Sequence, residues 1–348
     1  MSSTDQPVVT VLLSVYNADA FLSQAISSIL SQTWSDFELL IIDDGSTDDS
    51  LAVARQFSDP RIRLVKNDRN HGLAYTLNRG LDLARGEFVA RMDADDISLP
   101  ERLEKQVAFM RANPSISICG TSIRFFGDVP AMDVLYPSGH ETVCCRMLFV
   151  NSIAHPSVML RAETFRRLGL RYDPTSYAED FDLWQRCTDC MRLDNLPEVL
   201  LLYRISRGSF TQTHREGQAL SVAQVFRRQL SKLEASTDDA TLECHRAIGI
   251  EEPFEHPEQL VRVRKHLVSL WRANQRLAIY PPLAFRRTLK YYWEIACKKY
   301  CGDRRVSGRL YPCRELGTTS GIPAVLGRVG ECLAAVARRR SQESEGAS

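Results

Sequence analysis

Short apolar runs alternate with amphipathic stretches along the first hundred residues of the chain. The strand-like runs are residues 8–15, 37–42, 62–66 and 88–92. The stretches with helical spacing between them are residues 19–32, 50–57 and a segment that ends near 84–86. The second run is apolar without interruption from Leu39 to Ile42, which is typical of a strand covered on both faces. This β-α-β-α-β-α-β order predicts an α/β fold with a mostly parallel, Rossmann-like sheet and helices on both faces.

Later segments divide the chain into three parts. We expect a helix over 100–113, strands over 115–126 and 196–204, and another helix that opens near Ala178. From about Gln218 the pattern is polar and helical. The predicted domains are therefore an α/β domain at 1–215, a mainly helical C-terminal region at 216–340 and a disordered tail at 341–348.

Two of the strand-like runs end abruptly in carboxylates. Asp93, Asp95 and Asp96 follow the fourth run, and Asp43 and Asp44 follow the second. Ligands of open α/β sheets bind outside the carboxyl ends of the strands, so these side chains are expected to face one polar cleft. Carboxylates repel one another and are costly to desolvate. The first group therefore suggests a hard divalent cation, which takes oxygen ligands and shares them with substrate phosphates. The alternative is a solvated acidic turn.

Composition adds a strong asymmetry of charge. The 348 residues carry a net charge of only +1. Residues 260–340, however, hold 18 Lys and Arg against four acids, a net charge of +14. Such asymmetry indicates that the C-terminal region meets something anionic.

Location is predicted from what the sequence lacks. The first ten residues have neither the basic start nor the apolar core of a signal peptide, and no apolar run is long enough to span a membrane. Ten cysteines in such a chain are most simply reduced thiols. We therefore expect a cytoplasmic protein.

Seven motifs in a fixed order give this chain a resemblance to a known family. They are Ser14-Val15-Tyr16-Asn17, Ile29-Leu30-Ser31-Gln32-Thr33, Asp43-Asp44-Gly45-Ser46-Thr47-Asp48, Asn70-His71-Gly72-Leu73-Ala74, Arg91-Met92-Asp93-Ala94-Asp95-Asp96, His155-Pro156-Ser157-Val158-Met159 and Glu179-Asp180-Phe181-Asp182-Leu183-Trp184. Together they resemble the family 2 inverting glycosyltransferases, which have the GT-A fold of nucleotide-diphospho-sugar transferases. The resemblance runs from about Val8 to Arg204.

The resemblance implies a nucleotide-sugar site and a metal site. Ser14, Tyr16, Asn17, Asp43, Asp44 and Asp93 would bind the nucleotide sugar. One of Asp43 and Asp44 would accept a hydrogen bond from the base. Asp95, with Asp93, would hold Mg²⁺ or Mn²⁺ on the diphosphate, Arg91 could balance phosphate charge, and Asp96 is expected to cap the following turn. The alternatives are a core aromatic at Tyr16 and a turn residue at Asn17.

The resemblance also implies a catalytic base, Asp180, with His155 and Glu179 on the acceptor side. The chemistry agrees, because an acceptor hydroxyl is a poor nucleophile and a carboxylate within hydrogen-bond reach can take its proton. The alternatives are a helix N-terminus decorated with acids and a buried structural histidine at His155. On a helix, Asp182 would point roughly 200° away from Asp180.

Two departures from the family's pattern bear on the site. Ser14 stands where the family often has Pro. The family often carries a His shortly after Tyr-Arg, whereas here Ser206 follows Tyr203-Arg204-Ile205, and the nearest histidine is His214.

The C-terminal region has two interpretations. Cations at 262–276 and around Tyr291-Tyr292-Trp293 suit an anionic membrane surface, where basic side chains bind and aromatics lie at headgroup level. The alternative is a helical cap with a solvated basic face. Nucleic-acid binding is the weakest reading, and we expect none.

These observations predict a metal-dependent inverting glycosyltransferase. It would move a sugar, most simply from a UDP-sugar, to a hydroxyl of a growing glycan or lipid-linked acceptor in bacterial cell-surface polysaccharide synthesis. It would be cytoplasmic or peripheral on the inner membrane face. The alternatives are a non-catalytic nucleotide-sugar-binding scaffold and a nucleotidyltransferase.

Overall fold

The computed structural model describes residues 6–206, 215–250, 253–301 and 316. Two compact units make up the chain. The first contains residues 1–138 and 153–218, and the second contains residues 139–152 and 219–348. The predicted strand at 62–66 has the predicted bounds, and the other early elements end within a few residues of them.

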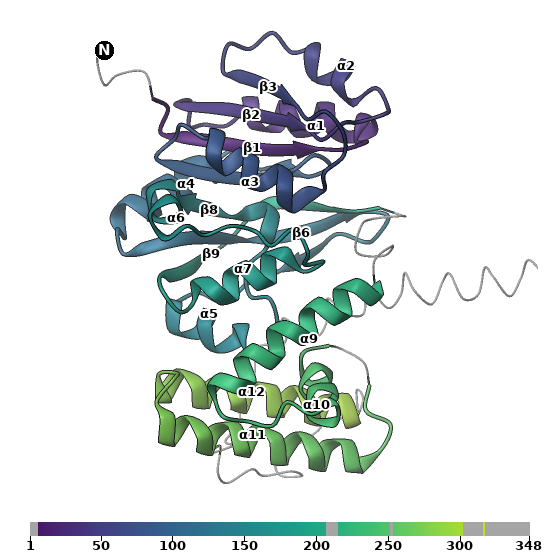
Figure 1. Cartoon of the computed structure of the whole chain (residues 1–348), viewed down its shortest axis with the longest axis vertical. Coiled ribbons are helices and arrows are strands. Elements are labelled where there is room, and N and C mark those ends of the chain that lie inside the picture. The colour runs from purple at the N-terminus through teal and green to yellow at the C-terminus, as the bar shows by residue number, and fades with distance from the viewer. Residues whose placement is uncertain (1–5, 207–214, 251–252, 302–315, 317–348) are drawn as a thin grey trace, which may run out of the picture. The chain divides into compact units, whose positions relative to one another are not determined.

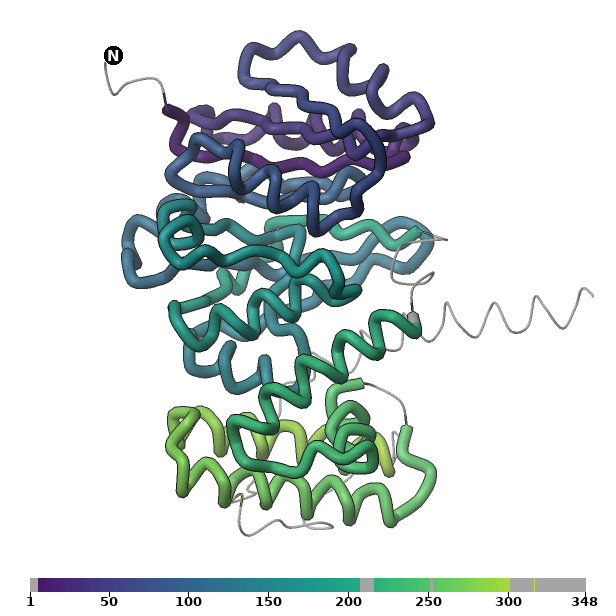
Figure 2. Tube along the Cα trace, viewed as in Figure 1, coloured from purple at the N-terminus to yellow at the C-terminus, as the bar shows by residue number. Residues whose placement is uncertain are grey.

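The first unit is an α/β domain (Figures 1 and 2). Its first half contains β1 (Val9–Val15), α1 (Asp19–Leu30), β2 (Phe37–Asp43), α2 (Ser50–Arg55), β3 (Ile62–Lys66), α3 (Leu73–Leu83) and β4 (Phe88–Asp93). Its second half contains β5 (Ile97–Ser98), α4 (Arg102–Ala112), β6 (Ile116–Gly127), β7 (Met132–Val134), the 3₁₀ turn η1 (His155–Ser157), β8 (Met159–Arg161), α6 (Ala162–Leu168), α7 (Glu179–Cys187) and β9 (Arg192–Ile205).

One mixed sheet forms the core of this unit. The strand order is β3-β2-β1-β4-β8-β6-β9-β5, and β7 pairs with β6. Strands β3, β2, β1 and β4 are parallel neighbours, as predicted, and β6 and β9 form a second parallel pair. β8 runs antiparallel to both β4 and β6 and joins the two halves.

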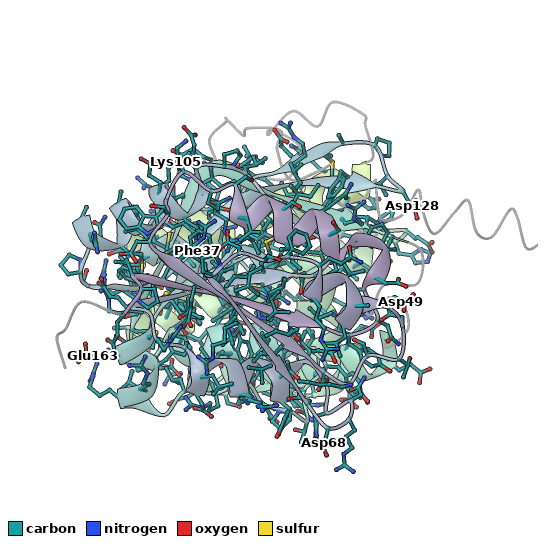
Figure 3. The ribbon with its side chains drawn as sticks, turned by 90° about the horizontal axis from the view of Figure 1, so that it is seen from above. Phe37, Asp49, Asp68, Lys105, Asp128 and Glu163 are labelled. Carbon is teal, nitrogen blue, oxygen red and sulfur yellow. The ribbon has the colours of Figure 1, made fainter. Side chains whose placement is uncertain are left out.

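Close packing between helix and sheet depends on a small residue in α3. A side chain at Gly80 would bring its Cβ within 2.3 Å of Leu12 Cδ1 on β1. Every residue of β2 is buried, as the uninterrupted apolar run predicted. Figure 3 shows Phe37, where β2 begins, well apart from Asp49 and Asp68, which follow β2 and β3.

The second unit is helical. It contains α5 (His140–Met147), α10 (Asp239–Gly249), α11 (Pro257–Leu277), α12 (Pro282–Cys301) and the part of α9 (Arg215–Lys232) that begins at Ala219. Fully buried apolar side chains from four of these helices form its core: Cys145, Leu230, Leu267, Leu270, Phe285 and Leu289. No pattern along residues 139–152 indicates that they group with this unit.

Part of the membrane-surface interpretation is wrong. Tyr292 and Trp293 are each only 3% exposed, so they are core residues of the helical unit and not headgroup anchors. Tyr292 packs on Phe149, with 4.3 Å between ring centroids. Within the described residues, no helix is both long and apolar enough to cross a membrane. Most of residues 302–348, including the predicted tail, lie outside the described part of the chain.

Candidate active site

The register of the parallel strands brings three predicted site residues to the same level of the sheet. Ser14 on β1 pairs with Asp93 on β4 and with Ile42 on β2. The next pair along β1 and β2 is Val15 with Asp43. The carboxyl ends of β1, β2 and β4 therefore lie side by side, with Ser14 between two acidic strand ends.

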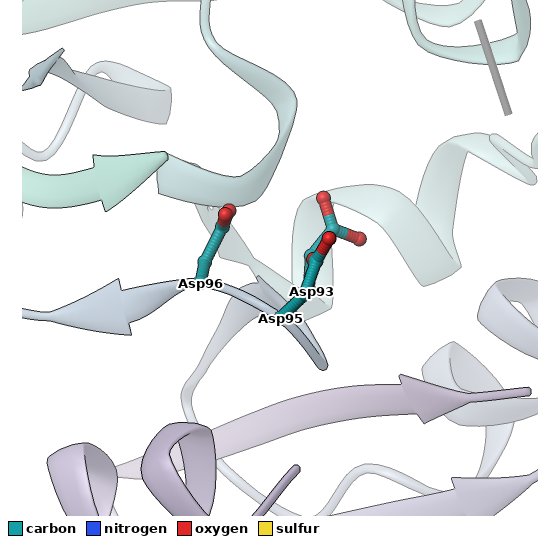
Figure 4. A group of neighbouring side chains, drawn as sticks. All are labelled: Asp93, Asp95 and Asp96. Carbon is teal, nitrogen blue, oxygen red and sulfur yellow. The ribbon is translucent and has the colours of Figure 1, made fainter. Parts of the chain in front are cut away.

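Three carboxylates cluster at the turn that follows β4 (Figure 4). Each of Asp93, Asp95 and Asp96 offers an oxygen, and these oxygens lie within 4.8 Å of one another. Burial and the charge of Asp93 raise the pKa of Asp95 to about 6. Burial and both neighbouring carboxylates raise the pKa of Asp96 well above its usual range. A cation among these groups would relieve their repulsion, so the donor set fits a divalent ion that prefers oxygen ligands.

The three carboxylates differ in the partners they already have. Asp93 forms an ion pair with the buried guanidinium of Arg91, with 2.7 Å from Arg91 Nη1 to Asp93 Oδ2. Asp96 Oδ1 accepts a hydrogen bond of 2.8 Å from the backbone N–H of Arg204. Asp96 Oδ2 is buried with no hydrogen-bond partner among the described residues. Asp96 thus fastens β9 to the turn, and the expectation that it caps the following turn was wrong.

Asp43 and Asp44, the two carboxylates at the end of β2, have different hydrogen-bond partners. The carboxylate of Asp44 accepts bonds from Asn67 Nδ2 at 2.5 Å and from the backbone N–H groups of His71 and Gly72. Asp43 Oδ1 accepts one bond from the Ser46 N–H at 3.1 Å, whereas Asp43 Oδ2 is buried and has no partner in the described structure. Asp44 is therefore committed to the loop after β3, and Asp43 retains an acceptor oxygen.

Gly45 explains how the loop after β2 and the loop after β3 come into contact. Gly45 has φ +72°, and a Cβ at this position would lie 2.5 Å from the backbone carbon of Arg69. Backbone atoms cannot move aside as a flexible side chain can. The loop after β2 and the loop after β3 can meet because residue 45 has no side chain.

Tyr16 and Asn17 behave differently at the end of β1. Tyr16 is 47% exposed, so the alternative of a core aromatic is excluded. Asn17 has φ +49°, and its Oδ1 accepts a bond of 2.9 Å from the Thr47 N–H. The geometry of Asn17 matches the turn-residue alternative, and its side chain holds the loop after β2.

The predicted acceptor-side residues lie at η1 and at the first turn of α7. His155 Nε2 is 3.1 Å from the Tyr172 hydroxyl, and His155 Nδ1 is 3.8 Å from Glu179 Oε1. Burial and the charge of Arg91 lower the pKa of His155 well below its usual range, so the imidazole is neutral. Burial and the charge of Asp180 raise the pKa of Glu179 to about 7.

Asp180 lies in the same electrostatic environment. Together with burial, its charge raises the pKa of Tyr136 as well as that of Glu179. Asp182 lies on another side of α7 and pairs with Arg186 at 2.9 Å, consistent with the helical spacing. Arg91 and Asp93 also act on the pKa of Glu179, which electrostatically links the α7 carboxyl groups to the turn after β4.

Sequence reasoning assigned no role to Arg204, which the structure places against the carboxylate turn. Its Nε donates to the Asp95 carbonyl oxygen at 2.7 Å, and its Nη2 donates to Gln24 Oε1 at 2.8 Å. Its guanidinium lies 4.2 Å from the ring centroid of Phe21 and 4.3 Å from that of Phe126. The only signal was its place in the Tyr-Arg motif. His214 lies outside the described residues.

Comparisons with known proteins identify the family of this chain. The model of the family described as glycosyl transferase family 2 matches residues 10–160. The O-antigen biosynthesis glycosyltransferase WbnJ of Escherichia coli is 35% identical over 213 residues, which are 58% of this chain and 81% of that protein. The chain belongs to glycosyl transferase family 2. The nucleotidyltransferase alternative is thereby set aside.

Solved structures confirm the GT-A fold of this family 2 glycosyltransferase. The structure of residues 1–349 of S. aureus TarS in complex with UDP has a TM-score of 0.53 and 19% identity, and covers 84% of this chain and 88% of that chain. The mannosyltransferase PcManGT of Pyrobaculum calidifontis, in complex with GDP-Man and Mn²⁺, has a TM-score of 0.53 and 19% identity, and covers 86% and 89%. At this level of identity the likeness concerns the fold.

Proposed function

We propose that this chain is a metal-dependent inverting glycosyltransferase that uses a UDP-sugar. The observation that carries the proposal is the cluster of Asp93, Asp95 and Asp96, within 4.8 Å, beside Ser14 and the carboxyl end of β2. This arrangement suits a nucleoside diphosphate whose phosphates share a cation with protein carboxylates.

The proposed nucleotide site uses the groups that retain bonding capacity. Asp43 Oδ2 is a buried acceptor without a partner in the described structure, so it matches a base that offers an N–H on its edge, as uracil does. The UDP bound to TarS supports this choice. Exposed Tyr16 is available to cover the base or ribose, and Ser14 would offer backbone contacts.

The proposed metal ligands are Asp95 first and Asp93 second. Arg91 Nη1 donates a hydrogen bond to Asp93, and the partnerless oxygen of Asp96 lies in the same cluster. Mg²⁺ or Mn²⁺ bound here would act as a Lewis acid on the leaving diphosphate, so that no proton donor is needed. The Mn²⁺ in PcManGT supports this assignment.

Asp180 is the proposed general base. It would accept the proton of the acceptor hydroxyl as that oxygen attacks the sugar from the face opposite the diphosphate, which inverts the anomeric configuration. Glu179 and His155 would line the acceptor side. We propose as acceptor a hydroxyl of a growing glycan or lipid-linked saccharide in cell-surface polysaccharide synthesis, in line with the role of WbnJ in O-antigen biosynthesis. We also propose a cytoplasmic location.

Nucleotide binding is the first test. Melting temperatures are measured with UDP, GDP, dTDP and CMP, each with Mn²⁺ and with EDTA. We expect UDP with Mn²⁺ to stabilise the protein by about 2.7 kcal/mol at a concentration 100-fold above its Kd. EDTA or Asp95→Asn should abolish this increase in melting temperature. Asp189→Asn, which changes an exposed aspartate, is the control and should retain it. If no nucleotide gives a metal-dependent increase in melting temperature, the proposed nucleotide and metal site is wrong.

Turnover is the second test. Asp180→Asn should keep the increase in melting temperature that UDP causes. It should lower the rate of sugar transfer by at least about 100-fold, because a general base typically contributes at least that factor. Asp182→Asn, two residues along the same helix, should cost stability without a comparable loss of kcat. The anomeric configuration of the product, read by NMR, decides between inversion and retention.

A further inference from the structure

Tyr172, which lies in none of the seven family motifs, is a buried residue beside His155 in the first unit. It is 2% exposed. Its backbone N–H donates to Asn78 Oδ1 on α3 at 2.9 Å, and Asn78 Nδ2 donates to its carbonyl oxygen at 2.8 Å. The centroid of its ring lies 5.3 Å from that of His155 and 6.1 Å from that of the fully buried Trp184. The backbone and the ring of Tyr172 are therefore both held in place.

The hydroxyl of Tyr172 decides which ring nitrogen of His155 carries the proton. Burial raises the pKa of Tyr172, so the hydroxyl keeps its own proton. Among the described residues, the hydrogen-bond partner of this hydroxyl is His155 Nε2, at 3.1 Å. A buried hydroxyl that donates to nothing has lost its hydration without compensation, so this O–H donates to Nε2. Because the imidazole is neutral, its proton is then on Nδ1.

The Nδ1–H group of His155 faces Glu179 across a gap. Nδ1 lies 3.8 Å from Glu179 Oε1, which is beyond the range of a direct hydrogen bond. The two side chains are 8% and 12% exposed, so both keep some contact with solvent. An oxygen within about 2.9 Å of both atoms would bridge this gap. A hydroxyl suits the position, because it can accept from Nδ1–H and donate to the carboxylate.

We infer that Tyr172 is a positioning residue of the acceptor site, which sets His155 to donate from Nδ1 to a saccharide hydroxyl that donates in turn to Glu179. The inference rests on the proposed glycosyltransferase function, since it places the acceptor sugar beside Asp180. Tyr172 acts through the imidazole and does not touch the sugar. Asp180 takes the proton of the attacking hydroxyl, whereas His155 and Glu179 hold a second hydroxyl of the same sugar that does not react.

Nuclear magnetic resonance of the full chain with ¹⁵N-labelled histidine tests the position of the proton without donor or acceptor. Spectra are recorded at pH 8, where Glu179, with a pKa of about 7, is ionised. We expect the parent to carry the His155 proton on Nδ1, and Tyr172→Phe to show averaged shifts for the two ring nitrogens, with His155→Gln assigning the signals. Tyr75→Phe removes the hydroxyl of an exposed tyrosine on α3 and should leave the His155 signals unchanged. A proton on Nε2 in the parent, or an unchanged tautomer in Tyr172→Phe, overturns the inference.

Titration with simple saccharides tests the bound hydroxyl. The probes are the methyl glycosides of glucose, galactose, mannose and N-acetylglucosamine, added with UDP and Mg²⁺ while the His155 signals are followed. We expect at least one probe to bind, Tyr172→Phe to weaken it about 5-fold and Glu179→Gln to weaken it at least about 10-fold. Tyr75→Phe should bind the probe as the parent does.

The melting temperature with UDP and Mg²⁺ separates the two possible failures. Tyr172→Phe should keep the increase in melting temperature that the parent shows with UDP. If the parent shows this increase but no probe moves its His155 signals at millimolar concentration, or if Tyr172→Phe binds the probe as tightly as the parent, the inference is overturned and the proposed nucleotide site stands. If the parent shows no increase with UDP, the proposed function is contradicted, and with it the acceptor site on which the inference rests.

Discussion

Two carboxyl groups occupy consecutive positions, Glu179 and Asp180, at the start of α7. Glu179 is 12% exposed in its side chain, so ionisation costs desolvation in addition to repulsion by Asp180. Helix N-termini favour negative charge, but only by about 0.3–1 kcal/mol. The raised pKa of Glu179, about 7, shows that burial outweighs the helix dipole here.

The first prediction concerns stability as a function of pH. The folded chain keeps a proton on Glu179 up to about pH 7, whereas the unfolded chain releases it near pH 4.5. Stability therefore falls as pH rises through this window, and the loss is complete above about pH 7. Glu179→Gln should be more stable than the parent by about 3 kcal/mol at pH 8, with almost no gain at pH 4.5.

Urea unfolding at both pH values measures this effect. Glu163→Gln, an exposed position on α6, is the control and should show no such difference between the two pH values. If Glu179→Gln and the parent are equally stable at pH 8, Glu179 ionises without cost and the environment described here is wrong.

The sequence predicted which residue types would gather at the site but not their bonding. The acidic ends of β2 and β4 are visible as patterns, and parallel pairing brings them together. No local pattern distinguishes Asp43 from Asp44. The difference arises because Asn67 and the N–H groups of His71 and Gly72 approach only one of them, from a loop more than 20 residues away.

At the scale of elements, the turn after β4 depends on β9 for its position. Arg204 joins the two through the Asp95 carbonyl oxygen and its own backbone N–H. Phe21 on α1 and Phe126 on β6 lie within cation–π distance of the guanidinium. Three elements, β9, α1 and β6, therefore hold this carboxylate turn in place.

The second prediction is that Arg204→Lys weakens the metal site without removing charge. Lysine keeps the cation but has neither the second directed donor nor the flat face that stacks on aromatic rings. We expect the increase in melting temperature with UDP to require about 10-fold more Mn²⁺. We also expect the free energy of unfolding to fall by about 1–2 kcal/mol. Arg124→Lys, whose ion pair with Asp133 is exposed, should change neither quantity measurably. An unchanged Mn²⁺ titration in Arg204→Lys would contradict this role.

The predictability of each element follows from how local its signal is. Strands β1 to β4 are short apolar runs flanked by helical patterns, and their order predicts their parallel pairing. β9 extends from Arg192 to Ile205, whereas the predicted strand covers only residues 196–204. The prediction begins too late because the polar residues Asp194 and Asn195 interrupt the apolar pattern at the start of the strand. The parallel pairing of β9 with β6 joins segments about 80 residues apart, and no periodicity within either strand specifies it.

At the scale of the whole molecule, the two units differ in the groups expected to respond to ligands and to pH. The first unit carries the nucleotide and metal candidates. The second carries a buried histidine pair, with 2.9 Å from His245 Nδ1 to His266 Nε2. His245 Nε2 lies 2.8 Å from the Leu148 carbonyl oxygen, which can only accept. Burial lowers the pKa of both imidazoles, so both rings are neutral, and His245 Nδ1 then accepts a hydrogen bond from His266 Nε2–H.

The third prediction is that acid destabilises the helical unit through this pair. Burial lowers the pKa of His266 to about 4, and burial with the neighbouring imidazole lowers that of His245 to about 3. The unfolded chain binds these protons below about pH 6.5, so stability falls as pH drops from there towards 4. At pH 5 each histidine should cost about 2 kcal/mol. His266→Gln, which keeps a donor for His245, should remove about half of this loss.

Melting temperatures are measured by calorimetry at pH 7.5 and pH 5, with and without UDP and Mn²⁺. This separates the stabilisation by nucleotide binding from the destabilisation by protonation of the histidine pair. His266→Gln should reduce the effect of acid while leaving the nucleotide shift at pH 7.5 unchanged, because the pair lies in the second unit and the nucleotide candidates lie in the first. His256→Asn is the control, since it removes an exposed histidine and keeps a capping side chain at the start of α11. If His266→Gln loses as much stability in acid as the parent, the buried pair is not the acid-sensitive element. Loss of the nucleotide shift in His266→Gln would mean that the histidine pair and the nucleotide site are energetically coupled.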